Sequence, residues 1–364
     1  MAADFRLKVY AYYYPWHSGA DDNKWEVCRE YSPYLGLYDS SDETVVRRHV
    51  EWALEFGIDG FLVEWFGEGT EFASFVNGCT GLLRSVLEDY PDLEFAIFFD
   101  QALRFYRRDF SGSHTRQAFV DEFLRIAADN FGHPNYMHVD GRPVVAIYLT
   151  RGTRGNYASL LVETRDRVDS AGFGRPYLVG DQVWWFLNTD NFEALDAVTA
   201  YNLHNNRQLR TLGGGVRQWA AHTAAFFASV LPQAAAVGTD VLPCIGHAYN
   251  DFALLGNLPF IPTVVEGAPP AYRQDTVECM KAQRAVWRDC PRFRRTGTAY
   301  LFVTSFNEWP ERSMLEPSAE IETFNYMPDF RDGTHLYLQP HRFEHLEGIR
   351  EGKRFVERNI LPNL

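Results

Sequence analysis

The chain has 364 residues, of which 46% are hydrophobic and 23% are charged, so it can bury a large core and is not an intrinsically disordered protein. Its formal net charge of −13 opposes binding to a phosphate backbone, because nucleic-acid binders gather Lys and Arg to replace released counterions. Basic pairs such as Arg47/Arg48 are typical of a solvated surface, and no nucleic-acid partner is expected.

Eight apolar runs follow one another along the chain, each of about strand length and rich in β-branched and aromatic residues. They are continuously apolar rather than alternating, which is typical of strands buried on both faces of a parallel sheet. In chain order the runs cover residues 9–16, 60–67, 94–101, 143–149, 176–185, 197–204, 241–251 and 299–309.

Helical patterns lie between most of these runs. The clearest covers residues 40–57, where Ser40 and Glu43 have the spacing of a capping box and Gly57 supplies a C-terminal stop. The weakest is residues 185–196, where only NTDNFEAL can form the fifth helix. The other patterns cover residues 70–89, 115–130, 156–171, 215–237 and 272–289.

This alternation predicts an α/β fold, a single (β/α)8 TIM barrel spanning residues 1–364, in preference to an open doubly wound sheet. The βα loops are expected to be long, and residues 257–270 form a candidate lid or subsite wall. A C-terminal helix is expected at residues 343–359, where it would close the barrel. No linker divides the chain into separate domains.

The cysteines and the N-terminus bear on location and cofactors. Five scattered cysteines without a CxxC pair fit neither a disulfide framework nor a zinc site and indicate a reducing compartment. The N-terminus lacks the pattern of a signal peptide, and no window approaches a membrane span. A cytoplasmic protein without a membrane partner is therefore expected, although a secreted protein trimmed of its signal would look the same. GGGV at residues 213–216 is not a GxGxxG motif, and we expect neither metal nor cofactor.

Functional residues of a TIM barrel lie where its strands end, so the residues that close the runs are considered together. Carboxylates and aromatic rings dominate among them. Aromatic faces stack on the C–H faces of a sugar ring, whereas acids and amides bind its hydroxyl groups, and a carbohydrate substrate is therefore expected. The candidate substrate-binding residues are Tyr13, Trp16, Glu64, Trp65, Asp100, Asp181, Trp185, Tyr201, His204, His247, Tyr249, Asn307 and Trp309.

The most informative segment is TSFNEWPERSMLEP, residues 304–317. Glu308 is predicted at the end of the eighth strand, and Glu311 lies just beyond, in a turn that Pro310 stiffens by fixing its own φ. Two acids so close raise each other's pKa, so that one can remain protonated as an acid while the other acts as a base. Glu308 and Glu311 are the predicted catalytic pair. The alternative is that either carboxylate only binds an Arg or caps a helix.

Several candidates also have a structural interpretation. Glu64 and Asp100 could equally well anchor hydrogen bonds within the protein. His204 and His247 lack the HxH or HExxH spacing of a metal site, so hydrogen-bonding roles are expected for them. Glu316 is expected to brace the loop rather than to react.

SFNEWPERSMLEP closely resembles the SFNEWHEG…IEP signature of glycoside hydrolase family 99, the endo-α-mannosidases, and of the related WbsX-type proteins of polysaccharide gene clusters. Other matching stretches are YYYPWH (12–17), PYLGLYDSSD (33–42) and GIDGFLVEWFG (57–67). The resemblance therefore runs from near the N-terminus to about residue 317, and NEWxE followed by EP is its most specific part.

The resemblance implies a (β/α)8 barrel and a retaining glycoside hydrolase acting on an oligo- or polysaccharide, with an α-mannoside as one candidate substrate. Glu308 matches the base that deprotonates the sugar 2-hydroxyl, so that O2 attacks C1 and forms a 1,2-anhydro sugar. Glu311 matches the acid that protonates the departing oxygen and then activates water. This is an exception to the usual carboxylate nucleophile, and it involves no metal or organic cofactor.

This chain departs from the family pattern at Pro310, which replaces a His, and at Arg312 and Ser313, which replace a Gly-Thr-like pair. The leaving-group side of the site therefore differs, and the sugar is left open. Two other functions also remain open. A glycosyltransferase would need a diphosphate site, commonly a DxD motif, which the chain lacks. A non-catalytic carbohydrate-binding barrel would not need two close carboxylates. The sequence does not determine the oligomeric state.

Overall fold

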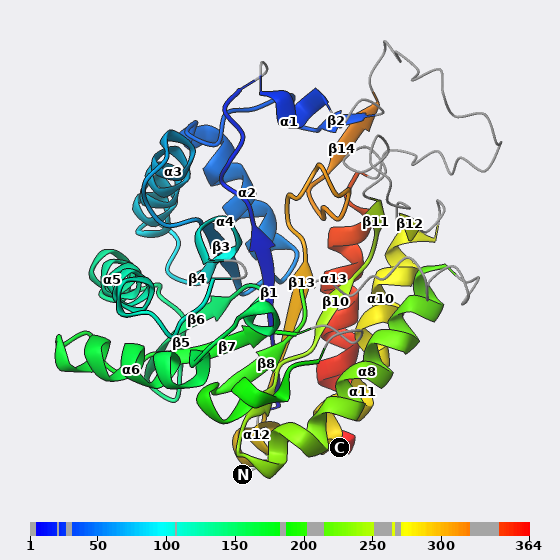
Figure 1. Cartoon of the computed structure of the whole chain (residues 1–364). Coiled ribbons are helices and arrows are strands. Elements are labelled where there is room, and N and C mark those ends of the chain that lie inside the picture. Colours follow the sequence, from blue (N-terminus) through cyan, green and yellow to red (C-terminus); the bar gives the residue numbers. More distant parts are fainter. Residues whose placement is uncertain are drawn as a thin grey trace, which may run out of the picture.

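A computed structural model describes residues 5–19, 22–26, 31–105, 108–182, 187–201, 215–250, 264–265, 271–320 and 342–364 (Figure 1). Its main sheet runs in the order β10-β13-β1-β3-β4-β6-β7-β8-β9, and every pair along this path is parallel. The strands are β1 (Arg6–Tyr13), β3 (Gly60–Trp65), β4 (Glu94–Phe99), β6 (Arg142–Ile147), β7 (Tyr177–Asp181), β8 (Ala197–Thr199), β9 (Asp240–Val241), β10 (Cys244–Gly246) and β13 (Thr298–Thr304).

The sheet closes through residues 240–246. β9 pairs with β8 and β10 pairs with β13, and only Leu242 and Pro243 separate these two short strands. Leu242 N–H donates to Val198 O (2.9 Å), and Pro243 O accepts from Phe302 N–H (2.9 Å). β9 and β10 are thus one interrupted seventh strand, and the predicted (β/α)8 barrel is confirmed.

Apolar side chains on both faces explain the continuous runs in the sequence. All six residues of β3 are buried, as are five of the six in β4. Rings fill the barrel interior: Tyr12 packs edge-on against Phe98 (4.6 Å between centroids) and Tyr201 (4.9 Å). The other face of the strands packs on the surrounding helices (Figure 1).

The predicted helices all have counterparts among the described residues, with the fifth the weakest as expected. It is the short 3-10 helix η2 (Thr189–Ala194). The longer helices are α2 (Glu43–Glu55), α3 (Glu71–Leu87), α5 (Ser113–Asn130), α6 (Tyr157–Ser170), α8 (Val216–Ala236), α10 (Tyr272–Ala282) and α13 (Glu344–Phe355). The short ones are α1 (Asn23–Glu26), α4 (Ala102–Phe105), η1 (Thr150–Gly152), α11 (Arg284–Asp289), α12 (Pro291–Thr296), η3 (Val356–Ile360) and η4 (Leu361–Asn363).

The predicted capping box of α2 is wrong. Asp42 is the N-cap, and its side chain accepts a hydrogen bond from Thr44 N–H (2.8 Å). Ser40 lies two residues earlier, where its hydroxyl accepts from His17 N–H (3.1 Å). Asp42 thus satisfies one N–H group at the helix end, the usual role of an Asp at the N-cap.

Two ribbons and the C-terminal helix complete the fold. The antiparallel ribbons are β2 (Tyr31–Pro33) with β14 (Ser318–Glu320), and β11 (Tyr249–Asn250) with β12 (Val264–Val265), while β5 (His138–Val139) pairs with β6. Lys353 of α13 pairs with Asp59 (2.6 Å), just before β3. Most of the candidate lid 257–270 lies outside the described residues. No helix in the described part of the chain is long and apolar enough to span a bilayer.

Gly60 allows the close approach of three strands. A Cβ at this position would lie 2.5 Å from the main-chain oxygen of Glu94 and 2.7 Å from the ring of Tyr10. We therefore expect Gly60→Ala to lower the free energy of unfolding by about 1–3 kcal/mol, the usual cost of overpacking a core. Chemical denaturation would measure this change.

Gly78→Ala on α3 is the matched control. A Cβ there meets nothing within 4 Å, so this exchange should stabilise the protein by up to about 1 kcal/mol through helix propensity. Equal stability of Gly60→Ala and the wild type would contradict the close packing described here.

Candidate functional site

The segment after β13 forms a tight turn that two main-chain hydrogen bonds close. Ser305 N–H donates to Ser313 O (2.6 Å), and Ser305 O accepts from Leu315 N–H (2.9 Å). The Ser305 hydroxyl accepts from Glu308 N–H (2.8 Å), which fixes the start of the turn. Arg312 has φ 51°, a conformation that favours glycine, which gives a physical reason for a Gly in the related signature. Glu308 and Glu311 are thus held on one turn at the C-terminal end of the barrel.

The two acids of this turn are linked by a main-chain hydrogen bond and by the charge of Glu311. Glu311 N–H donates to Glu308 Oε1 (3.2 Å), and Glu308 is buried with no hydrogen-bond partner for Oε2 among the described residues. Burial, and then the negative charge of Glu311, raise the pKa of Glu308 well above its usual range, against smaller opposing effects of the Glu311 main-chain N–H and of Lys24. Glu311 is half-buried, and its Oε2 accepts from the Tyr201 hydroxyl (3.1 Å).

A second acid pair stands at the ends of β3 and β4. Burial raises the pKa of Glu64 well above its usual range, and the charges of Asp100 and Glu308 add to this shift. Burial also raises the pKa of Asp100 to about 6. The interaction between the two carboxyl groups raises the pKa of Glu64 and opposes the rise in the pKa of Asp100, which favours the proton on Glu64. Because Glu64 senses the charges of both Glu308 and Glu311, the four acids form one electrostatic group.

Tyrosines surround these acids. The Tyr201 ring packs against the rings of Tyr12 (4.9 Å between centroids) and Tyr148 (5.6 Å), and Tyr14 packs on Trp16 (4.5 Å). Tyr201 and Trp16 were predicted from the sequence, whereas Tyr14 and Tyr148 were not among the predicted substrate-binding residues. Tyr148 follows β6, so applying the strand-end rule to that run would have found it.

Asn307 and Asp181 reach the same end of the barrel but bind the protein itself. The Asn307 carboxamide accepts from Tyr14 N–H (2.7 Å) and donates to Tyr14 O (3.0 Å). Asp181 accepts from Tyr201 N–H (2.8 Å) and pairs with Arg151. Both side chains therefore fix the backbone that carries the tyrosines.

Glu316 anchors the turn from behind, as expected. Its carboxylate is fully buried and accepts from Trp309 Nε1–H (2.7 Å) and the Tyr38 hydroxyl (2.8 Å). His49 Nε2 lies 3.0 Å from the other oxygen, and the Tyr13 hydroxyl lies 3.1 Å from His49 Nδ1. Trp309 and Tyr13, predicted to bind substrate, belong instead to this buried network.

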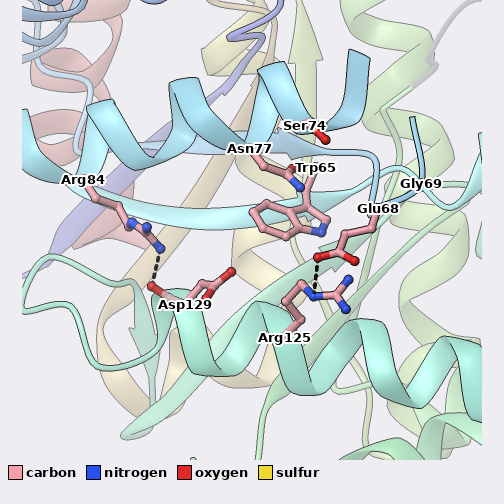
Figure 2. Close-up of a pocket in the computed structure, with 8 residues that line it drawn as sticks. All are labelled: Trp65, Glu68, Gly69, Ser74, Asn77, Arg84, Arg125 and Asp129. Atoms are coloured by element: carbon pink, nitrogen blue, oxygen red, sulfur yellow. Dashed lines mark hydrogen bonds and ion pairs between the residues drawn. The ribbon is translucent and has the colours of Figure 1, made fainter. Parts of the chain in front are cut away.

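Trp65 lies away from the acids. Successive residues of a strand point to opposite faces, so the face that carries Glu64 cannot carry Trp65. The Trp65 indole N–H donates to Glu122 of α5 (2.8 Å), and Figure 2 shows the ring between α3 and α5. Its predicted place in the sugar site is therefore corrected.

The remaining candidates come from the later strands. His247 Nε2 lies 2.9 Å from Met314 O, and its ring packs on His345 of α13 (4.3 Å), so it supports the turn by hydrogen bonding, as expected. Tyr249 is buried in the β11–β12 ribbon. Trp185 and His204 lie outside the described residues. Within the described ranges, no three His, Cys, Asp or Glu side chains are grouped as metal ligands.

Comparisons with solved structures find similar folds over the whole chain. A glycoside hydrolase-like protein has a TM-score of 0.71 at 19% identity, covering 96% of this chain and 94% of that one. The GH99 endo-α-mannosidase from Bacteroides thetaiotaomicron, in complex with bis-tris propane, has a TM-score of 0.65 at 16% identity and 97% coverage of both chains. A glycoside hydrolase family 5 mannosidase from Rhizomucor miehei has 0.53 at 10%, covering 94% and 91%. No protein-family model and no curated protein matches the sequence.

We expect Glu316→Gln to destabilise the protein by about 1–3 kcal/mol. One oxygen accepts from Trp309 and Tyr38 and the other contacts His49, and the neutral amide would weaken the two charge-assisted bonds and turn its NH2 group towards one of these buried partners. Denaturant unfolding would measure the loss. Glu55→Gln, at an exposed position of α2, is the matched control and should leave stability unchanged; an equally small effect of both variants would exclude the anchoring role.

His247 should make stability depend on pH. Burial lowers the pKa of His247 from 6.5 to about 4, so the unfolded chain binds a proton more readily than the folded protein. The resulting stabilisation is complete above pH 6.5 and is lost as pH falls towards 4, by up to about 3 kcal/mol. His247→Gln, which keeps an N–H donor for Met314 O, should weaken the fall in unfolding midpoint between these pH values. Parallel curves for the variant and the wild type would contradict this prediction.

Proposed function

We propose that this protein is a glycoside hydrolase that cleaves an oligo- or polysaccharide, with Glu308 and Glu311 as its catalytic pair. The observation that carries the proposal is the placement of both carboxyl groups on one turn at the C-terminal end of β13, one buried and one half-buried, with the Glu311 main-chain N–H bound to the Glu308 carboxylate. The fold shared with glycoside hydrolases supports it, because active sites of such barrels lie at this end.

In this proposal Glu308 is the base. A buried carboxylate with a raised pKa holds a proton more strongly than a solvated one, which suits it to take the proton of a sugar 2-hydroxyl. The unpartnered Oε2 of Glu308 gives that hydroxyl an acceptor. O2 then attacks C1 as the glycosidic bond breaks, and the products are a 1,2-anhydro sugar and the departing alcohol.

Glu311 is the proposed acid. It is the more accessible of the two, and it delivers its proton to the departing glycosidic oxygen. Once ionised, it takes a proton from water as that water attacks C1 and opens the anhydro ring, while O2 takes back the proton held by Glu308. Two inversions at C1 give net retention, and both carboxyl groups regain their starting state.

The reaction requires that, of the two acids, Glu311 carries the proton and Glu308 is ionised. In the free protein, burial instead favours the proton on Glu308. Substrate binding can reverse this preference. A 2-hydroxyl that donates to Glu308 stabilises its ionised form, because a hydrogen bond to the charged form lowers the pKa. The Tyr201 hydroxyl would then keep the protonated Glu311 oriented through Oε2. Binding of a sugar with the correct C2 arrangement would therefore prepare the acid as well as the base.

Glu64, Asp100 and the surrounding tyrosines would hold the sugar in this reaction. A carboxyl group that shares a proton with another can both donate to and accept from sugar hydroxyls. The solved neighbours include an endo-α-mannosidase, and these contacts do not require a β-mannoside. α-Mannosides are therefore the first substrates to test.

The test is a screen of aryl α- and β-glycosides, α-mannans and bacterial oligosaccharides, with products followed by mass spectrometry and the anomer by NMR. We expect a product of retained configuration. Glu308→Gln and Glu311→Gln should each lower kcat by about 10²- to 10⁴-fold, because each removes a group that moves a proton. Glu55→Gln, on the surface, should leave kcat unchanged.

Four results would contradict the proposal. An inverted product would exclude the two-step path, and a small loss of rate in both variants would exclude the pair. Tight calorimetric binding of a sugar nucleotide would instead favour a transferase. Glycan binding without any product, unchanged in the double Gln variant, would favour a non-catalytic barrel.

A further inference from the structure

A separate pocket lies on the outer side of the barrel, between α3 and α5 (Figure 2). Its cavity volume is about 310 Å³, at the small end of the range for ligand sites. The lining residues are Trp65, Glu68, Gly69, Ser74, Asn77, Arg84, Arg125 and Asp129. Trp65 follows Glu64 in β3, so the pocket and the acid group lie on opposite faces of the same strand.

Charge is balanced around this pocket. Two guanidinium groups, Arg84 and Arg125, and two carboxylates, Glu68 and Asp129, line it. Arg125 Nε is 2.8 Å from Glu68 Oε1, and its Nη1 is 3.5 Å from Glu122 Oε2. Arg84 Nη1 donates to the main-chain O of Asp129 and to Asn130 Oδ1 (3.0 Å). Because the formal charges cancel, the pocket favours neither a phosphate nor an ammonium group.

Hydrogen-bonding capacity remains in the pocket. Asn77 Nδ2 donates to Gly67 O (3.1 Å), but its Oδ1 is buried without a partner among the described residues. A buried acceptor of this kind requires a donor from water or from a ligand. The Ser74 hydroxyl donates to Thr70 O (3.1 Å) and can still accept, and each guanidinium has more N–H groups than the contacts above use.

We propose that this pocket binds one uncharged sugar unit, separately from the acid group inside the barrel. Each sugar hydroxyl both donates and accepts, which matches donors and acceptors placed around one small cavity with an indole in its wall. Sugar binding in the pocket does not depend on the proposed function. A role of the pocket in holding a polysaccharide during turnover does rest on it.

The test follows the indole N–H signal of Trp65 by NMR on the full chain. Trp65→Phe identifies the signal, and D-glucose, D-mannose and D-galactose are the neutral probes. We expect a saturable shift with a Kd in about the millimolar range, as for a site of few contacts. D-Glucuronate and D-glucosamine, which keep the ring but carry charge, should bind more weakly. A crystal soaked with D-glucose gives a second readout that needs no variant.

Ser74→Phe is the blocking variant. Ser74 is exposed on α3, so a larger side chain there covers the pocket without entering the core. It should abolish the shift, and Asn77→Leu should weaken binding about 3- to 10-fold by removing one acceptor. Ser85→Phe, the same exchange at an exposed position of α3 outside the lining residues, is the control and should bind as the wild type does.

Three outcomes would overturn the proposal. The first is the absence of any shift or bound density with the neutral sugars, and the second is tighter binding of glucuronate or glucosamine. The third is a shift that survives Ser74→Phe but vanishes in the Glu308→Gln/Glu311→Gln variant, since the sugar would then be inside the barrel. None of these outcomes depends on turnover, so none of them tests the proposed hydrolysis. Conversely, a loss of hydrolysis would not test sugar binding in the pocket.

Discussion

The hydrogen bonds that hold residues 305–316 determine the geometry on which the rest of the site depends. Main-chain bonds between Ser305 and Ser313 close the turn, and the buried carboxylate of Glu316 binds it from behind through Trp309. A charged acceptor held by several donors is rigid, because each donor would be left unsatisfied if the carboxylate moved. This rigidity keeps two mutually repelling acids, Glu308 and Glu311, three positions apart on one turn.

That repulsion gives the site its chemistry. Burial raises the pKa of Glu308 and of Glu64, and each ionised neighbour raises it further. Protons are therefore shared within the acid group, and a bound sugar can redistribute them by its own hydrogen bonds. The proposed hydrolysis uses this property, because the base and the acid exchange protonation states during one cycle. The tyrosines also influence the protonation of these acids, because the Tyr201 hydroxyl donates a hydrogen bond to Glu311.

The side on which each strand residue points explains which of the predicted residues lie near the carboxylate turn. The strand-end rule found Glu64, Asp100, Tyr201 and the carboxylate turn, because every strand delivers its last residues to the same end of the barrel. The rule does not distinguish the two faces of a strand. Trp65 points outward to Glu122, and Tyr13 outward to His49, although both follow the same rule as their inward-facing neighbours.

The sequence by itself determined the (β/α)8 barrel, the order of its elements and the pairing of Glu308 with Glu311, because apolar periodicity and separation along the chain are local properties. Only the tertiary structure decided which of the remaining polar residues face the acids. Asn307, Asp181 and Trp309 are bound within the protein by partners up to 293 positions away in the chain, and no local pattern records such partners. Burial, which raises the pKa of Glu308, is likewise a property of the assembled barrel.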